Sequence, residues 1–343
     1  MKKIDLKSLT LKELEDVFLQ INEKKFRAKQ VFKWIHKQKV DSIDDITVLS
    51  KKLRDKLNEN HKIGNIKKFK RFDSNIDNTK KYLFILEDSN IIESVMMEYK
   101  HGVSLCLSTQ VGCKMGCSFC ASTKDGLVRN LTPSEILDQV YSIEKDLNVK
   151  VSNIVLMGTG EPLDNYDNVL KFLRLIHDKN GLNIGYRHIT LSTCGIVPKI
   201  YELAEEALPI TLSISLHTPF DEDRQEIMPI ANRYSIGEII EACKYYIKKT
   251  NRRITFEYTL IDEVNDTNRH AEKLVKLLSG LLCHVNLIPL NPIKENDLVK
   301  SKKESINRFK SYLDVRGISA TIRREMGSDV NAACGQLRRD YKK

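Results

Sequence analysis

Three cysteines in the first half of the chain are spaced so that they can hold a metal cluster and leave one of its metal ions without a protein ligand. Cys113, Cys117 and Cys120 lie within eight residues, in a C-x3-C-x2-C pattern. A closed structural zinc site normally takes four protein ligands arranged as two pairs, and no second pair follows in this sequence. A [4Fe–4S] cluster held by three thiolates keeps one iron free to bind a small molecule. The spacing therefore favours an iron–sulfur cluster with one open iron.

The same spacing resembles that of the radical S-adenosylmethionine (SAM) enzymes. This resemblance implies that the open iron binds the amino and carboxylate groups of SAM. The residues alone leave a second interpretation, in which a distant cysteine such as Cys106 completes a zinc site. The chain would then be a zinc-stabilised RNA-binding protein without catalysis.

Length, composition and cysteine content limit the class of protein. The chain has 343 residues, of which 41% are hydrophobic and 30% charged. These values suit one large α/β domain with a small accessory module. The start lacks the apolar run of a signal peptide and no stretch approaches membrane-spanning length, so we expect a cytoplasmic protein with no membrane partner. Eight cysteines in such a chain indicate metal or redox chemistry rather than a disulfide framework.

The charge of the chain points to a polyanionic partner. The net charge is +10, and a basic excess attracts nucleic acid. Aromatic residues, Phe26 and Phe69 among them, are interleaved with the N-terminal basic residues. These basic residues are Lys24, Lys25, Arg27, Lys29, Lys67, Lys68, Lys70 and Arg71.

Strand and helix patterns alternate from about residue 103 onward. Strand-like segments lie at Leu105–Ser108, Asn153–Met157, His188–Ser192, Thr211–Leu216, Ile254–Leu260 and Val285–Pro289, with a last one at Ala320–Arg323. Helix-like segments lie at 133–147, 165–178, 196–206, 235–249, 266–280 and 301–315. Such alternation predicts a parallel sheet covered by helices. Six units are too few for an eight-fold barrel, so we predict an α/β fold with a partial, open (β/α)6 barrel.

The part before this barrel has a different pattern. Helical stripes of apolar residues, the first preceded by a capping box of Thr10 and Glu13, predict a small helical domain. Two β-rich runs around residues 87–90 predict a hairpin. We therefore divide the chain into a helical RNA-binding accessory domain (1–75), a β-hairpin extension (76–100), and a partial barrel that ends in a loop containing a cysteine (101–343).

Polar and small residues follow the strands of the predicted barrel, where such barrels place their working residues. A ligand with an amino acid part and a ribose needs donors and acceptors at several separated points. Strand ends that converge on one rim can supply them. The SAM-binding residues predicted on this ground are Gly160, Glu161, Ser192, Ser215, Leu216, His217 and Asn291.

Several segments together resemble one family, the bacterial RNA adenine-C2 methyltransferases (the RlmN family). The resemblance spans nearly the whole chain and includes the cysteine motif. Its other segments are Phe26–Gln30, Ile92–Val95, the Gly160–Pro162 turn, Asn286–Pro292 and Asp329–Leu337. It implies two substrates: an adenosine in 23S rRNA, and the adenosine 3′ of the anticodon in a subset of tRNAs. It also implies an electron donor such as flavodoxin or ferredoxin, and a monomer.

The resemblance assigns roles to three further residues. Cys334 accepts a methyl group from one SAM, and a second SAM is cleaved reductively at the cluster to generate the radical. Two SAM molecules are thus used per turnover. Cys106 releases the methylated RNA by forming a disulfide with Cys334, and Glu93 matches the family's candidate base for the C2 proton. Without the resemblance, the two cysteines would be read as small buried residues and Glu93 as a surface carboxylate.

A related group of enzymes, the C8 adenosine methyltransferases of the Cfr type, is the nearest rival. They use the same machinery and confer antibiotic resistance, but tend to have alanine where this chain has Pro162. The C2 assignment is therefore favoured. One departure from the family pattern is Thr159, which replaces the usual methionine in the Gly-Met-Gly-Glu-Pro turn. We expect it to alter packing beside SAM without abolishing binding.

Overall fold

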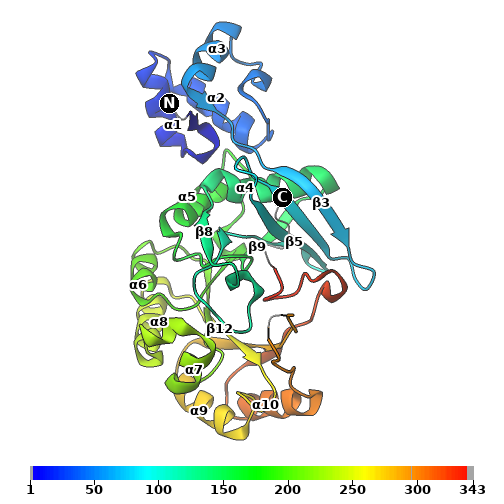
Figure 1. Cartoon of the computed structure of the whole chain (residues 1–343). Helices are drawn as coiled ribbons and strands as arrows, with labels where there is room; N and C mark the ends of the chain where they lie inside the picture. The colour runs from blue at the N-terminus through cyan, green and yellow to red at the C-terminus, as the bar shows by residue number, and fades with distance from the viewer. Residues whose placement is uncertain (1–2, 295, 338–343) are drawn as a thin grey trace.

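A mostly parallel sheet organises the chain, and an antiparallel extension continues it at one edge (Figure 1). The computed structural model describes residues 3–294 and 296–337. The main sheet has the strand order β14-β13-β12-β11-β10-β9-β6-β5-β4-β3. Strands β6 and β9 to β14 are parallel, whereas β3, β4, β5 and β6 pair antiparallel in succession.

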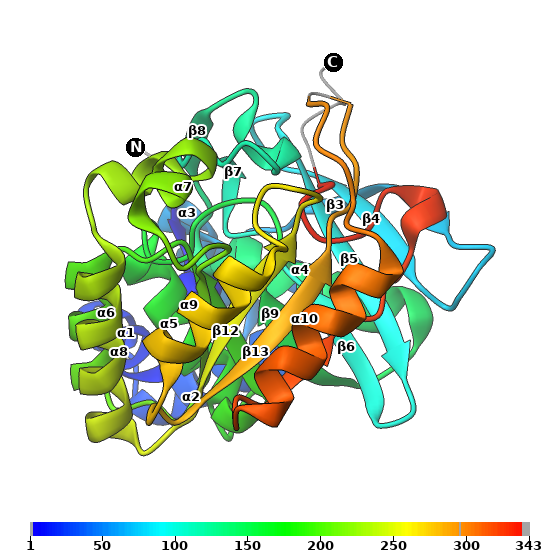
Figure 2. The same ribbon diagram turned by 90° about the horizontal axis from the view of Figure 1, so that it is seen from below.

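The predicted partial, open (β/α)6 barrel is confirmed. Its strands are β6 (Gly102–Cys106), β9 (Val151–Leu156), β10 (Ile189–Thr193), β11 (Thr211–Ser215), β12 (Ile254–Leu260), β13 (Cys283–Pro289) and β14 (Ala320–Ile322). Its helices are α4 (Pro133–Leu147), α5 (Tyr166–His177), α6 (Val197–Glu205), α7 (Asp221–Ile227), α8 (Ile236–Thr250), α9 (Asn268–Leu278) and α10 (Lys303–Val315). Figure 2 shows that the helices cover the outer face of the sheet.

The part of the chain before the barrel contains three helices and three antiparallel strands. The helices are α1 (Leu11–Gln20), α2 (Lys25–His36) and α3 (Lys51–Asn60), and the strands are β3 (Lys67–Asp73), β4 (Lys80–Ile85) and β5 (Ile91–Tyr99). The predicted capping box of Thr10 and Glu13 is present at α1, and analogous boxes begin α4 and α8. Each box pairs donors that a helix start would otherwise leave free. Two small sheets complete the strands: β1 (Ile4–Asp5) with β2 (His61–Lys62), and β7 (Gln110–Gly112) with β8 (Leu127–Asn130).

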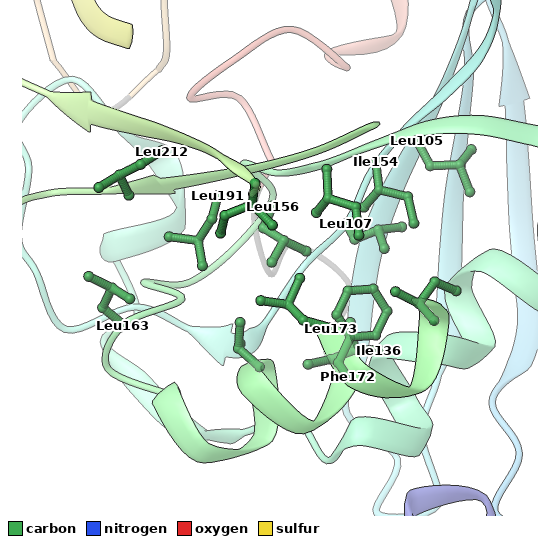
Figure 3. Packing of buried hydrophobic residues seen from close by; sticks show 14 of the residues in the cluster. Leu105, Leu107, Ile136, Ile154, Leu156, Leu163, Phe172, Leu173, Leu191 and Leu212 are labelled. Atoms are coloured by element: carbon green, nitrogen blue, oxygen red, sulfur yellow. The ribbon is translucent and has the colours of Figure 1, made fainter. Parts of the chain in front are cut away.

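The barrel core packs strand side chains against the covering helices (Figure 3). Leu105 and Ile154 from the sheet lie with Ile136 of α4 and with Phe172 and Leu173 of α5, and all five side chains are fully buried. Burial of one such side chain stabilises the fold by about 1.5–3 kcal/mol. This packing fixes the strands and therefore the positions of their ends.

The accessory helices meet the barrel through buried polar contacts. Lys7 Nζ lies 2.5 Å from Asp138 Oδ1 on α4, and both side chains are almost completely buried. The second oxygen of Asp138 accepts a hydrogen bond from Ile66 N at 3.1 Å. His36 Nδ1 lies 2.9 Å from the Tyr141 hydroxyl, also on α4. The accessory region is therefore attached to α4 by specific pairs rather than by apolar packing alone.

The helices bear on whether the chain can cross a membrane. None of those in 3–294 or 296–337 has both the length and the apolar character required to cross a bilayer.

We predict that Asp138→Ala lowers the free energy of unfolding by about 3–5 kcal/mol, because it leaves Lys7 as a buried charge without its partner. Asp41→Ala is the control, since it removes an exposed pair with Lys145 and should cost under about 1 kcal/mol. Urea unfolding of the full chain measures both. Equal, small effects would show that the Lys7–Asp138 pair does not secure the accessory region.

Candidate active site

A cavity of about 160 Å³ opens at the carboxyl ends of the parallel strands. Most of the predicted site residues lie in its wall, although they come from distant parts of the sequence. Those lining it are Cys113, Cys117, Cys120, Gly160, Glu161, Ser192, Ser215, His217, Asn291 and Cys334. Of the other predicted residues, Leu216, Cys106 and Glu93 are not part of the described wall. The strand ends thus converge as the barrel rule predicts.

The cysteine motif follows the short strand β7 and enters the cavity. Gly112 has a φ of +75°, and a Cβ there would lie 1.9 Å from the Gly126 carbonyl oxygen, so only glycine fits. Cys113 N donates to that same oxygen at 3.0 Å. Pairing of β7 with β8 therefore fixes the start of the motif, and the following turns direct Cys117 and Cys120 to the cavity.

The donor set of the cavity fits a three-thiolate cluster. Burial raises the pKa of Cys113 to about 12 and that of Cys117 well above its usual value, and neighbouring thiols add to both. Buried thiolates require a cation, and bound iron supplies one. The described residues contain no group of three or more His, Cys, Asp or Glu side chains arranged for a single metal ion. A [4Fe–4S] cluster does not need that arrangement, because each thiolate binds a different iron.

The Gly160–Glu161 turn after β9 is shaped by Gln110. Gly160 has a φ of +111°, and a Cβ there would lie 2.6 Å from the Gln110 Cβ. Gln110 Oε1 accepts the Glu161 N–H at 2.8 Å. The Glu161 carboxylate accepts from Leu163 N at 3.0 Å and from Cys194 N at 2.8 Å. Glu161 thus ties the turn after β9 to the end of β10, while the backbone of Gly160 lines the cavity.

His217 and Asn291 present polar atoms to the cavity. His217 Nδ1 accepts from Thr259 N at 2.9 Å, which places the ring proton on Nε2. Burial lowers the pKa of His217 to about 3, so the ring is a neutral donor. Asn291 Oδ1 and Glu257 Oε2 are buried and, within the part of the chain that the structure describes, have no hydrogen-bond donor. Unsatisfied acceptors beside a cavity suit a ligand with ammonium, hydroxyl or amino groups, as SAM has.

Leu216, another predicted SAM-binding residue, lies at the end of the neighbouring strand. Its side chain is fully buried in the core, and its backbone carbonyl accepts from Arg224 Nε at 3.3 Å. Arg224 also donates to the carbonyls of Cys194 at 2.6 Å and Ser215 at 3.1 Å. Arg224 therefore connects the ends of β10 and β11 from behind the cavity.

The C-terminal segment crosses the cavity mouth and brings Cys334 into its wall (Figure 1, red). Asn291 Nδ2 donates to the Cys334 carbonyl at 3.0 Å. The next residue, Gly335, accepts from Ala121 N at 2.8 Å, directly after the cysteine motif. Ser122 Oγ donates to the Leu337 carbonyl at 2.7 Å. Cys334 is thus anchored both to the loop after β13 and to the segment that follows Cys120.

Cys106 lies on β6, close to Cys334 but behind the wall. The pKa of Cys106 is raised to about 12 by burial and by Cys334, and the Arg323 guanidinium opposes this shift. Arg323 lines the cavity and lies 3.7 Å from Glu257 Oε2. All eight cysteines are free thiols in this structure. The two predicted partner cysteines are therefore neighbours that share one cation.

Glu93 is buried on β5 and faces the antiparallel extension. Its Oε1 lies 3.1 Å from Lys81 Nζ, with both side chains almost fully buried. The sequence-based prediction gives Glu93 the role of removing the adenine C2 proton. In the structure it pairs with Lys81 and does not belong to the cavity wall. It shares a face of the sheet with Cys106, because Val95 on β5 is paired with Cys106 and lies two residues from Glu93.

Thr159 does not line the cavity. Its N–H donates to Ser108 Oγ at 3.0 Å, and its carbonyl accepts from Thr109 N at 2.9 Å and Gln110 N at 3.2 Å. Its hydroxyl lies 3.4 Å from Ser122 Oγ. The departure from the family pattern therefore lies next to Ser122, a residue that lines the cavity and also anchors Leu337.

Sequence reasoning gave no site role to Gln110, Arg224, Glu257, Lys81 or Arg323. A signal was available for two of these residues. Arg323 is the last residue of a predicted strand, and Glu257 is a carboxylate inside an apolar strand. Gln110, Arg224 and Lys81 act through contacts with distant segments, which no local pattern reveals.

Comparison with known proteins agrees with this arrangement. Residues 107–278 match the radical SAM superfamily, and residues 4–63 match the ribosomal RNA large subunit methyltransferase N-terminal domain. A probable dual-specificity RNA methyltransferase RlmN from Clostridium novyi (strain NT) is 58% identical over 97% of this chain and 97% of that protein. The chain belongs to the RlmN family.

Two further relatives show how much of the chain this RlmN similarity covers. The probable dual-specificity RNA methyltransferase RlmN of Clostridioides difficile (strain 630) is 58% identical over 99% of both chains. The crystal structure of a radical SAM methyltransferase from Sphaerobacter thermophilus superposes with a TM-score of 0.92. It is 43% identical and covers 98% of this chain and all of that one. As a radical SAM methyltransferase of the RlmN family, the chain uses a [4Fe–4S] cluster and SAM.

We predict that Cys113→Ala, Cys117→Ala or Cys120→Ala each abolishes cluster assembly, because each of the three thiolates of the motif binds a different iron. Cys194→Ala is the matched control, since Cys194 lines the same cavity but lies outside the motif. Iron and sulfide analysis of anaerobically purified protein measures the loss. A triad variant with a full iron load, or a colourless wild-type protein containing zinc, would contradict the assignment.

Proposed function

We propose that this enzyme methylates C2 of one adenosine in 23S rRNA and of the adenosine 3′ of the anticodon in a subset of tRNAs. The curated relatives, named dual-specificity RNA methyltransferases, support an RNA substrate. One structural observation carries the proposal. Cys334, from the end of the chain, lies in the same cavity wall as the cysteine motif. A thiol beside a cluster site is what methyl transfer through a cysteine requires.

In this proposal, the cavity holds both cofactors. Cys113, Cys117 and Cys120 bind the cluster through their thiolates. Gly160, Glu161, Ser192, Ser215, His217 and Asn291, which line the cavity, contact SAM, while Leu216 supports the end of its strand from the core. The cluster and SAM, when bound, supply the radical chemistry that adenine C2 needs, since this electron-poor carbon does not attack a sulfonium methyl group.

Cys334 serves as the methyl carrier. Its thiolate attacks the methyl carbon of one SAM, so that an S–C bond forms on Cys334 and S-adenosylhomocysteine leaves. The methyl carbon, once activated by hydrogen abstraction, would bond to adenine C2. The adduct would then give up one electron, which the oxidised cluster can accept, and the C2 proton, so that the RNA is linked to Cys334 through a closed-shell S–C bond. The hydrogen bond from Asn291 to the Cys334 carbonyl holds the carrier at the cavity during these steps.

Cys106 releases the product. Its thiolate attacks the Cys334 sulfur, so that a Cys106–Cys334 disulfide forms and the S–C bond breaks. The electron pair goes to the carbon attached to adenine, which takes a proton and becomes the methyl group. Arg323 favours this step, because the guanidinium beside both sulfurs stabilises the thiolate that attacks.

Glu93 is the proposed base for the C2 proton. Its Oε1 lies 3.1 Å from Lys81 Nζ, and a carboxylate is a group that can accept a proton. Its position behind the cavity wall implies that bound RNA opens a path to it, since catalytic contacts often tighten only in the complex.

The accessory region, residues 1–75 in the sequence-based division, is proposed to bind RNA, with the hairpin extension (76–100) joining it to the barrel (101–343). Phe26 on α2 is 52% exposed, and Arg27 lies over its ring at 5.0 Å. Lys24 and Lys29 are exposed on either side. An exposed ring among cations can stack on a base while lysines contact phosphates.

We further propose a cytoplasmic monomer that receives its electrons from a flavodoxin or ferredoxin. Three thiols that must stay reduced for a cluster suit a reducing compartment. The net charge of +10 suits an electron carrier with an acidic surface.

We predict that the double substitution Lys24→Glu and Lys29→Glu weakens RNA binding by at least about tenfold and flattens its salt dependence, because two phosphate contacts are lost. Lys244→Glu with Lys248→Glu on α8 changes the net charge equally and is the control. Binding to transcribed tRNA across a salt series measures both. Equal losses in the two proteins would show that overall charge, rather than the accessory region, binds RNA.

We predict that wild-type enzyme produces 2-methyladenosine, that Cys334→Ala produces no modified RNA, and that Cys106→Ala accumulates RNA attached covalently to Cys334. Each cysteine serves a different step, so their loss should stop the reaction at different points. Mass spectrometry of digested RNA identifies the modified carbon, and denaturing gels detect the adduct.

Cys243→Ala is the control for general damage, since Cys243 is buried in α8, outside the cavity wall. Its activity should persist. Multiple turnovers by Cys106→Ala without an adduct would refute the two-cysteine mechanism, and 8-methyladenosine would establish the C8 rival.

A further inference from the structure

One face of the antiparallel extension carries a row of side chains that leads to Cys106. Lys81 on β4 is paired with Val95 on β5, and Val95 is paired with Cys106 on β6. Directly paired residues project to the same side of a sheet. Val95 and Cys106 also pack against Ala332 and Leu337 of the C-terminal segment. This face is therefore the surface on which the Cys334 segment rests.

The connection between β3 and β4, residues 74–79, holds the same segment from its other side. Asp329 Oδ1 accepts from Ser74 Oγ at 2.7 Å, and its Oδ2 accepts from Asn75 N at 2.8 Å. Asp77 Oδ2 accepts from Gly327 N at 3.0 Å. The bonds from Asn75 and Ser74 hold the pKa of Asp329 below its usual value. Two carboxylates thus tie the start of the segment to the extension.

Gly327 shows how closely the two chains approach. Its φ is +62°, and a Cβ at this position would lie 2.6 Å from Thr79 Cγ2 and 2.8 Å from Ala332 Cβ. Ala332 N donates to the Gly327 carbonyl at 2.9 Å, which closes a compact turn. Thr79 is fully buried beneath this turn. The turn therefore fits against the connection as a preformed unit.

Lys81 attaches the C-terminal segment at Asn331, which is closer in sequence to Cys334 than Gly327 or Asp329. Its Nζ donates to the Asn331 carbonyl at 3.3 Å and pairs with Glu93 at 3.1 Å. A buried ammonium needs several acceptors, and here the C-terminal segment supplies one of them. Lys81 thus contacts both the proposed base and the segment that carries the proposed methyl carrier.

We infer that residues 74–79 and Lys81 form a clasp that holds the C-terminal segment over Cys106, and that Lys81 is a positioning residue for Cys334. The inference rests on the proposed function of Cys334 as methyl carrier. Downstream of Cys334, the bond from Ala121 to Gly335 is independent of the clasp. Loss of the clasp therefore frees the upstream side of Cys334 and leaves the cysteine motif intact.

The test compares Lys81→Met with Lys80→Met in the full-length protein carrying its cluster. Lys80 is adjacent on β4 but pairs with Asp73, away from the C-terminal segment. For Lys81→Met we expect amide hydrogen exchange in residues 328–334 to become about tenfold faster, as for the loss of one charged hydrogen bond. Methylated RNA per SAM cleaved should fall by a similar factor, while iron content is unchanged. Lys81→Arg should restore both, and Lys80→Met should match wild type.

A second pair of variants keeps the test valid if Lys81→Met does not fold. Asp329→Ala removes the bonds from Ser74 and Asn75 at an exposed position, and Asp73→Ala is its control on the same extension. Asp329→Ala should reproduce the faster exchange and the lower yield.

Three results would overturn the inference. In the first, hydrogen exchange stays at the wild-type rate in both Lys81→Met and Asp329→Ala. In the second, exchange becomes faster but methylation is complete, and in the third, methylation is lost while exchange is unchanged. In the last case Lys81 would act through Glu93 alone. A wild-type enzyme that methylates no RNA would instead refute the proposed function, and the exchange measurements would still decide whether the clasp exists.

Discussion

The arrangement of this enzyme depends on anchoring one short chain segment, residues 327–337, at the mouth of the barrel. Ala332 and Leu337 pack on the extension, and hydrogen bonds to the backbone of the segment add to this packing. Asn291, Ala121 and Ser122 bind it from the barrel, and Lys81 binds it from the extension. Because each bond is modest alone, the segment is held by their number.

The antiparallel extension solves a problem that a partial barrel creates. An open barrel exposes the edge of its first strand, and an exposed edge invites pairing with other chains. Here β5 covers β6, so Cys106 becomes buried between two neighbouring strands. Burial and the neighbouring Cys334 raise the pKa of this thiol to about 12, so it is protonated at neutral pH. One structural element therefore closes the sheet, shields a reactive thiol and holds Glu93.

Much of this could be predicted from the sequence, because barrel strands and helices have local signals. The strand ends, and with them Ser192, His217 and Asn291, follow from periodicity alone. Strand β3 was missed since its seven residues include four lysines and arginines, and β4 rather than its own pattern holds it in the sheet. Leu216 and Glu93 show the opposite limit. Sequence gives the position of a residue along a strand. It does not give the partner of its polar groups, which is Arg224 for the Leu216 carbonyl and Lys81 for the Glu93 carboxylate.

Buried charge explains why these long-range contacts matter. An isolated buried ion is costly, so each one must lie where a partner from elsewhere in the chain can reach it. Lys81 requires Glu93 and the Asn331 carbonyl, and Arg323 requires Glu257 and the sulfurs of Cys106 and Cys334. Each of these ions favours the docked position of a neighbouring segment over its alternatives. The same groups that favour the chemistry of the thiols therefore also hold the extension, the barrel and the C-terminal segment in register.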